Sequence, residues 1–260
     1  MENRVYDLDI PVSSFNGQLL ARVLDSGYQC IAVSHSVNID DFNFNLKGED
    51  ASVRKKTKEE RQTMRASLVS QLKPTPTDKL NKCLEESNAF RATIQPPASF
   101  FTPRIFRRIT LHCEDPSLTG LFFREFGEML NAYDIVSLCP SSSEALSYAV
   151  EQAPSIDMIT LDYTKTTDFR LTSKQCAVLL SRGLHLELQL SPILRPGQAG
   201  TSARTSFGHM ITNLLAITRT SFNKAFVNYE RSINPVIATD VGFSSSHFGV
   251  TLPPPREGYE

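Results

Sequence analysis

Short apolar runs alternate with segments of helical spacing at the start of the chain. Residues 5–10 are a strand candidate with β-branched and aromatic residues at its core. Residues 15–26 then carry leucine and valine at helical spacing until Gly27 closes the segment. A second apolar run follows at residues 29–34. A β-α-β unit of this length joins two parallel strands through a crossover helix. The pattern therefore predicts a parallel sheet.

The same alternation returns after residue 104. Strands are predicted at residues 105–113, 133–139, 156–161 and 184–190, and helices at residues 118–131, 141–152, 172–181 and 203–218. The strands are continuous apolar runs, as parallel strands covered on both faces require. No GxGxxG or GxxxxGK motif follows a strand, which argues against a nucleotide-binding doubly wound sheet. We expect an α/β fold of the TIM-like kind, a parallel β/α barrel.

A long charged insertion, residues 38–104, separates the two parts of this pattern. Within it, residues 54–72 consist mostly of strong helix formers and predict one helix. Two interpretations of this helix stay open. We favour a solvated surface helix, because charge runs are usually solvated faces, and the alternative is a basic segment that docks RNA or a partner protein.

The C-terminal part of the chain is less regular. We expect residues 1–220 to form the barrel domain, with the insertion included. Residues 221–249 then form a divergent last barrel segment, with short strands expected at residues 225–229 and 236–239. Residues 250–260 are rich in proline and are expected to be a disordered tail.

Composition narrows the possible functions. The 260 residues carry a formal net charge of -1, so any RNA-binding surface must be a local patch. The five cysteines form no CxxC pair, which favours free, buried thiols in a reducing compartment over disulfides or a zinc site. Neither a signal peptide nor an apolar stretch of ~20 residues occurs, and we expect an intracellular, soluble protein.

Candidate metal ligands stand near the ends of the predicted strands. Functional side chains of a β/α barrel gather at the carboxyl ends of its strands. There, Asp7, Asp9 and His35 could hold metal ions for phosphoester hydrolysis. However, no HxH or DxH pair occurs at a strand end and no GxSxG motif is present. We therefore favour a binding protein without catalytic residues, metal or cofactor, and keep the phosphoesterase as the alternative.

Basic side chains near the loops are the second set of candidates. The predicted RNA-binding residues are Arg107, Arg108, Lys165, Arg170, Arg195 and Arg204. Such cations neutralise phosphates and give salt-sensitive affinity without reading the base sequence. Because Arg107 and Arg108 are adjacent in a strand, they point to opposite faces, and at most one of them can serve a given surface.

Six segments together resemble a known family. They are YDLDIP at 6–11, GYQCIAVSH at 27–35, RRITLHCEDPS at 107–117, YDIVSLCP at 133–140, IDMITLDYT at 156–164 and RGLHLELQLSPIL at 182–194. In this order and spacing the chain resembles the Rpp-type barrel subunit of ribonuclease P and ribonuclease MRP, a family whose barrel is similar to the PHP phosphoesterases. The resemblance covers about residues 5–218.

The resemblance implies a non-catalytic role. The RNA of the ribonucleoprotein would remove the 5′ leader of precursor tRNA, with the barrel protein supporting it. Implied partners are the ribonuclease P and MRP RNAs, a small α/β Pop-type subunit, other proteins of the complex and, indirectly, precursor tRNA, in the nucleus and nucleolus. Asp7-Leu8-Asp9 stands where the PHP family has its HxH metal motif. The text after Thr218 departs from the family, so we expect an atypical C-terminal end. Whether this end is divergent or truncated, and whether the barrel closes by itself, stay open at this point.

Overall fold

The computed structural model describes residues 6–41, 58–93, 101–161 and 171–188, with a few positions between 205 and 238. Seven strands form one sheet in which every neighbouring pair is parallel and the spatial order follows the chain. They are β1 (Tyr6–Pro11), β2 (Cys30–Asn38), β3 (Arg104–Cys113), β4 (Ile135–Pro140), β5 (Met158–Leu161), β6 (His185–Leu188) and β7 (Ile237–Ala238).

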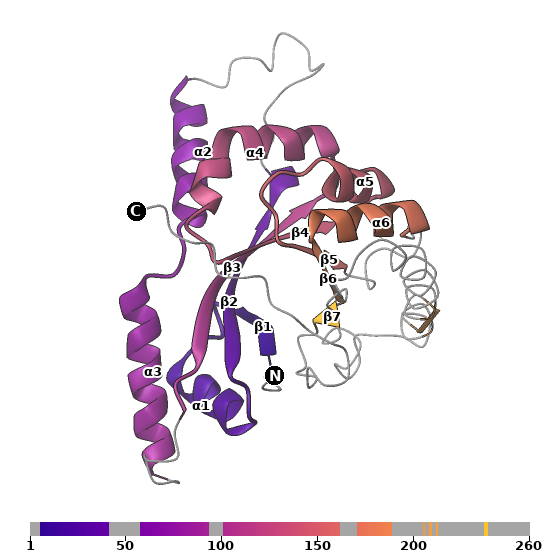
Figure 1. Ribbon diagram of the computed structural model, residues 1–260. Coiled ribbons are helices and arrows are strands. Elements are labelled where there is room, and N and C mark those ends of the chain that lie inside the picture. Colours follow the sequence, from indigo (N-terminus) through magenta and orange to yellow (C-terminus); the bar gives the residue numbers. More distant parts are fainter. Residues whose placement is uncertain are drawn as a thin grey trace.

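The sheet is curled (Figure 1). Cα atoms of the first and last strands, β1 and β7, approach within 8 Å of each other. Side chains from β3 and β6 also meet across the space that the sheet encloses. The predicted α/β class with a TIM-like parallel barrel is therefore confirmed.

Four crossover helices begin at side-chain caps that the sequence supplies. They are α1 (Gly17–Asp25), α4 (Pro116–Leu130), α5 (Ser143–Glu151) and α6 (Ser173–Arg182). Asn16, Asp115, Ser142 and Thr172 each accept a hydrogen bond from a backbone N–H in the first turn. Gly183 ends α6 with φ 68°, a left-handed conformation that glycine adopts without a steric penalty.

The two faces of the sheet bury different residues. Outward-facing side chains such as Ile109, Val136 and Ile159 pack under the helices in the main apolar core. Inward-facing Leu8, Ala32 and others form a small apolar cluster at the amino-terminal end of the barrel. All five cysteines are buried and none forms a disulfide, as predicted. Among the described residues, no helix is long and apolar enough to cross a membrane.

Within residues 58–93, the part of the insertion beyond η1 that the structure describes, two helices are present where the sequence predicted one. The prediction at residues 54–72 is confirmed by α2 (Lys58–Gln71), but α3 (Thr77–Ala92) was missed. A 3-10 turn, η1 (Ile39–Asp41), precedes them. Helix α3 lies beside α1 (Figure 1), and Leu80 and Cys83 join the apolar cluster of α1. The insertion is therefore packed on the barrel along α3.

The C-terminal predictions are only partly covered by the described residues. Strand β7 falls within the strand predicted at residues 236–239 and pairs with β6. The strand expected at residues 225–229, the tail at 250–260 and most of the helix at 203–218 lie outside the described residues.

Candidate functional site

A buried polar layer crosses the middle of the barrel. The side chain of Arg108, fully buried on β3, binds Glu187 on β6 with both ends of its guanidinium, at Nη1–Oε1 2.7 Å and Nη2–Oε2 2.5 Å. It also donates to the carbonyl of Leu8 and the hydroxyls of Thr110 and Thr160. All five guanidinium N–H groups therefore have an acceptor, which is what a buried arginine requires.

Glu187 is the second charge of this layer and is also almost fully buried. Burial raises the pKa of the Glu187 carboxyl, and the guanidinium of Arg108 opposes that shift. Thr160 donates to Glu187, and its oxygen lies 2.5 Å from the Ser137 hydroxyl, so the layer continues onto β4. The carboxylate of Asp9 interacts electrostatically with both charges.

The mouth of the barrel lies above this layer, at the carboxyl ends of β2 and β3. Strand β2 runs on to Asn38, beyond the end predicted at residue 34, and Asn38 lies beside His112 in the register of the two strands. Nε2 of His112 is 2.9 Å from Oγ of Ser36. A serine, an asparagine and one histidine thus occupy this part of the mouth.

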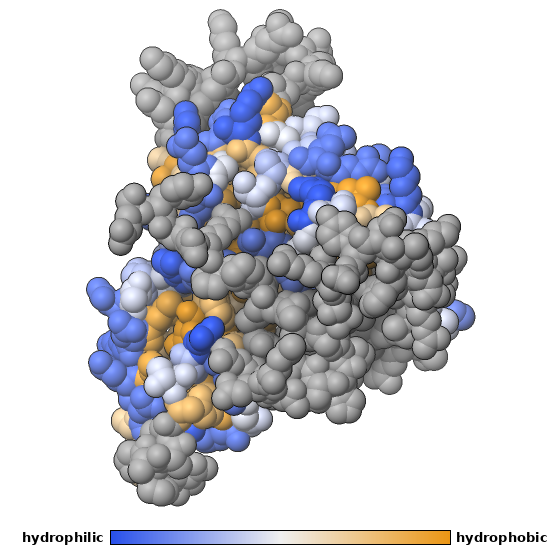
Figure 2. All heavy atoms as spheres, viewed as in Figure 1, coloured by the Kyte–Doolittle hydropathy of each residue, from blue (hydrophilic) through white to orange (hydrophobic). Residues whose placement is uncertain are grey.

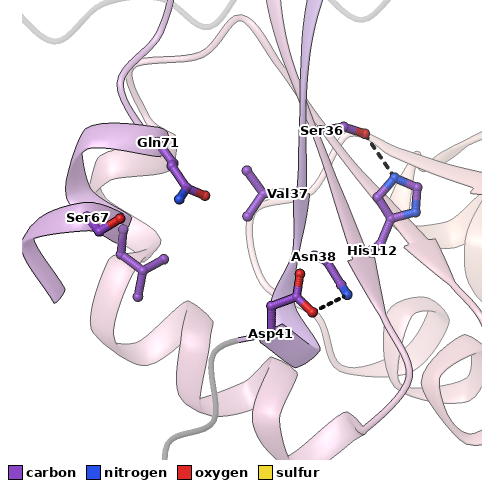
Figure 3. A pocket seen from close by; sticks show the side chains of 8 residues that line it. Ser36, Val37, Asn38, Asp41, Ser67, Gln71 and His112 are labelled. Carbon is purple, nitrogen blue, oxygen red and sulfur yellow. Dashed lines mark hydrogen bonds between the residues drawn. The ribbon is translucent and has the colours of Figure 1, made fainter. Parts of the chain in front are cut away.

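A pocket of about 500 Å³ opens beside this mouth, between α2 and the end of β2 (Figure 3). It is lined by Ser36, Val37, Asn38, Asp41, Ser67, Leu68, Gln71 and His112. Nδ2 of Asn38 donates to Oδ1 of Asp41 at 2.9 Å, which orients the carboxylate. Val37 and Leu68 are buried and supply an apolar wall. Hydroxyl, amide, imidazole and carboxylate groups thus line the pocket beside this wall, with no lysine or arginine among them.

Two of the three residues of the metal alternative, His35 and Asp9, have different surroundings, while Oδ1 of Asp7 accepts from the backbone N–H of Asp9 at 3.3 Å. His35 is inside β2 rather than at its end, and its ring faces Tyr133 (centroids 6.0 Å apart) with Nε2 2.9 Å from Thr75 Oγ1. Burial, with a smaller effect of Lys79, lowers the pKa of His35. The carboxylate of Asp9 instead interacts electrostatically with the guanidinium of Arg108 inside the barrel. Within the described ranges, no group of three or more His, Cys, Asp or Glu could hold a metal ion.

The structure separates the two adjacent arginines, as their alternation predicts. Arg108 has no exposed surface and all of its donors are used, so we withdraw it from the RNA-binding candidates. Arg107 lies on the outer face with its side chain 32% exposed, and Asp134 binds its Nε and Nη2 at 3.1 and 3.2 Å. RNA binding by Arg107 remains a prediction. Lys165, Arg170, Arg195 and Arg204 lie outside the described residues.

The insertion presents cations that the sequence reasoning did not select. Arg65 and Lys73 flank the pocket along the chain, and Lys79 and Lys82 follow on α3. All four are exposed, and none forms an ion pair with a described residue. Figure 2 shows hydrophilic residues over the outer side of α3. Arg65 belongs to the charged helix predicted at residues 54–72, for which a docking role is the alternative interpretation, whereas the three lysines follow after it.

A family model described as RNase P subunit p30 matches residues 4–227. This chain belongs to the RNase P subunit p30 family. The family resemblance found in the sequence is thereby confirmed, and the p30 match includes β1 to β6 and the insertion.

This p30-family chain is also similar to a plant protein over part of its length. Protein GAMETOPHYTE DEFECTIVE 1 of Arabidopsis thaliana is 30% identical over 95 residues, which cover 36% of this chain and 16% of that protein. The chain thus spans less than a fifth of the length of that relative.

Two solved structures are also similar. A chain in a cryo-EM structure of archaeal ribonuclease P with mature tRNA has a TM-score of 0.49 at 10% identity, over 83% of this chain and 69% of that one. An enolase protein from environmental shotgun sequencing of the Sargasso Sea has a TM-score of 0.29 at 14% identity, over 74% and 48% of the two chains.

Proposed function

We propose that this chain is a non-catalytic protein subunit of the ribonuclease P ribonucleoprotein, and that it supports RNA-catalysed removal of the 5′ leader from precursor tRNA. The observation that carries the proposal is membership of the RNase P subunit p30 family over residues 4–227. Family membership does not assign catalysis, so the non-catalytic role rests on the geometry of the barrel.

Two features of the barrel favour binding over cutting. The Arg108–Glu187 pair fills the lumen below the mouth and uses all of its hydrogen-bonding groups internally. Metal-dependent phosphoester cleavage needs several hard ligands at one place. Asp9 on β1 instead interacts with Arg108 inside the barrel, whereas His35 on β2 packs against Tyr133 of the main apolar core. The described residues therefore favour the subunit over the metal-dependent phosphoesterase.

The proposed partners follow from the same role. They are the ribonuclease P and MRP RNAs, a small α/β Pop-type protein subunit and other proteins of the complex, with precursor tRNA contacted indirectly and the nucleus and nucleolus as the location. Support for RNA contact comes from four exposed cations of the insertion, Arg65, Lys73, Lys79 and Lys82, which can neutralise phosphates, although exposed carboxylates at Asp78, Glu85 and Glu86 share α3 with the two lysines.

Co-purification tests the proposal. The tagged chain is expressed in its own cells and the RNA bound to it is sequenced, with the untagged strain as the control. We expect strong enrichment of ribonuclease P RNA. A preparation that contains neither ribonuclease P nor MRP RNA contradicts the proposal.

A separate assay tests the non-catalytic assignment. Purified chain, free of RNA, is incubated with precursor tRNA and manganese, and we expect no release of the 5′ leader. Cleavage that Asp9→Ala abolishes would assign the chemistry to the protein.

A further inference from the structure

The pocket beside β2 contains polar groups that the fold does not use. Both polar atoms of the Asn38 carboxamide are hydrogen-bonded, because Nδ2 donates to Asp41 and Oδ1 accepts from the backbone N–H of Asp40. By contrast, the carboxamide of Gln71, the hydroxyl of Ser67 and Oδ2 of Asp41 make no hydrogen bond to any described residue. Figure 3 shows Ser67 and Gln71 on α2 across the pocket from Val37 and Asp41. These free groups are available to a ligand.

The pocket has the size and the apolar wall of a site for a flat ring. About 500 Å³ falls within the ~300–1,000 Å³ typical of small-ligand sites, where apolar surface holds the ligand and a few polar groups fix its orientation. Val37 and Leu68 form the buried apolar part, each 5% exposed. A heterocycle lying against them would present its edge to Gln71 and Asp41.

Charges around the pocket are divided between two sides. On the α2 side, Arg65 lies one turn before Leu68, and Lys73 follows two residues after Gln71; both are exposed and without an ion pair to a described residue. On the β3 side, the Asp41 carboxylate lines the pocket, and the neighbouring Asp40 accepts a hydrogen bond from the backbone N–H of Asp115 at 3.3 Å. A polyanion can approach along α2 but is repelled from the β3 side.

We propose that this pocket binds one unpaired nucleobase of an RNA that carries an exocyclic amino group, with the adjoining phosphates on Arg65 and Lys73. The Asp41 carboxylate accepts a hydrogen bond from the amino group, and the Gln71 carboxamide pairs with the neighbouring ring nitrogen or carbonyl. Adenine, cytosine and guanine offer such an amino group, whereas uracil has none and presents a single N3–H between two carbonyls that face the carboxylate unfavourably. The RNA ligand rests on the proposed function, but the pocket and its base preference are tested separately.

Binding of short single-stranded oligonucleotides to the full chain tests the preference. Fluorescence anisotropy with labelled oligo(A), oligo(C) and oligo(U) should give about tenfold tighter binding of oligo(A) and oligo(C) than of oligo(U), the discrimination expected from one base-edge contact. Asp41→Asn should remove the preference, and Gln71→Ala, on an exposed side chain, should weaken oligo(A) binding without unfolding the chain. Asp78→Asn, a matched charge change on the exposed side of α3, should leave the preference intact.

The phosphate contacts have a separate signature. The double variant Arg65→Gln and Lys73→Gln should weaken all three oligonucleotides equally and make the salt slope of log affinity shallower by about 1.4, since each contact to a single strand contributes about 0.7. If the double variant changes the affinity for only one of the three oligonucleotides, the assignment of Arg65 and Lys73 to phosphates is contradicted.

Three results overturn the proposal, and they can be told apart from failure of the subunit role. Equal affinity for the three oligonucleotides overturns it, and so does a preference that survives both Asp41→Asn and Gln71→Ala. If Asp41→Asn instead releases one co-purified protein and leaves RNA binding unchanged, the pocket holds a basic side chain of a partner. In each of these cases, ribonuclease P RNA still co-purifies with the chain if the subunit role is right. If the chain shows the base preference but ribonuclease P RNA does not co-purify, only the subunit role is contradicted.

Discussion

Arg108 and Glu187 form a bidentate ion pair across the barrel lumen, although 79 residues separate them in the chain. Both side chains are almost completely buried, at 0% and 1% exposed. The pair also binds the Leu8 carbonyl and Thr160, so it connects β1, β3, β5 and β6. It therefore links the first strand of the curled sheet to the third, fifth and sixth through side-chain hydrogen bonds.

Removing one partner of this ion pair should lower the stability of the fold strongly. Glu187→Ala leaves the guanidinium of Arg108 buried without its counter-charge, and we expect a loss of about 3–5 kcal/mol in the free energy of unfolding. Urea denaturation followed by circular dichroism measures it. The double variant Arg108→Met and Glu187→Leu should recover most of the loss, since no unpaired charge remains. If the double variant is as unstable as Glu187→Ala, the cost lies in packing rather than in charge.

Stability should depend on pH through His35. Burial and Lys79 lower the pKa of His35 in the folded chain below its ordinary value of 6.5, so protonation favours the unfolded state. The stabilising contribution is complete above about pH 6.5 and is lost as the pH falls below that value toward the folded pKa. His35→Gln should flatten this part of the profile of unfolding free energy against pH. An NMR titration that places the His35 midpoint above 6.5 contradicts the prediction.

A glycine allows α1 and α3 to approach closely. A Cβ added to Gly17 would lie 2.6 Å from Cβ of Glu86, which α3 cannot relieve by a side-chain rotation. Gly17→Ala should therefore destabilise the chain by about 1–3 kcal/mol and speed hydrogen exchange in α3. Gly127→Ala in α4 is the matched control: nothing lies within 4 Å of its added Cβ, and alanine should stabilise that helix by up to about 1 kcal/mol. Equal effects at the two glycines would mean that helix propensity, not the contact with α3, decides.

Arg182 stabilises the end of α5 from the neighbouring helix α6. Its guanidinium donates to the carbonyls of Ala149, Val150 and Ala153, which have no partners within the helix. Arg182→Ala should lower the melting temperature, with a cost of about 1–3 kcal/mol. Arg182→Lys should recover only part of it, because one ammonium cannot span three carbonyls as a planar fork does. Full recovery by lysine would indicate a charge effect on the helix dipole alone.

Local pattern determined much of the fold. Apolar runs and helical spacing are short-range properties, so the sequence placed β1 to β6, the four crossover helices and the parallel class close to their observed positions. It also showed that Arg107 and Arg108 point to opposite faces, because alternation is intrinsic to a strand.

Only the tertiary structure decided what those residues do. The curl of the sheet brings Glu187 to Arg108 and turns a candidate RNA-binding side chain into part of the core. The extension of β2 to Asn38 moves His35 away from the strand end, and the packing of α2 against β2 creates the pocket at Gln71 and Asp41. The physical reason is that desolvation, ion pairing and cavities depend on distances between segments far apart in the chain, which no local periodicity encodes.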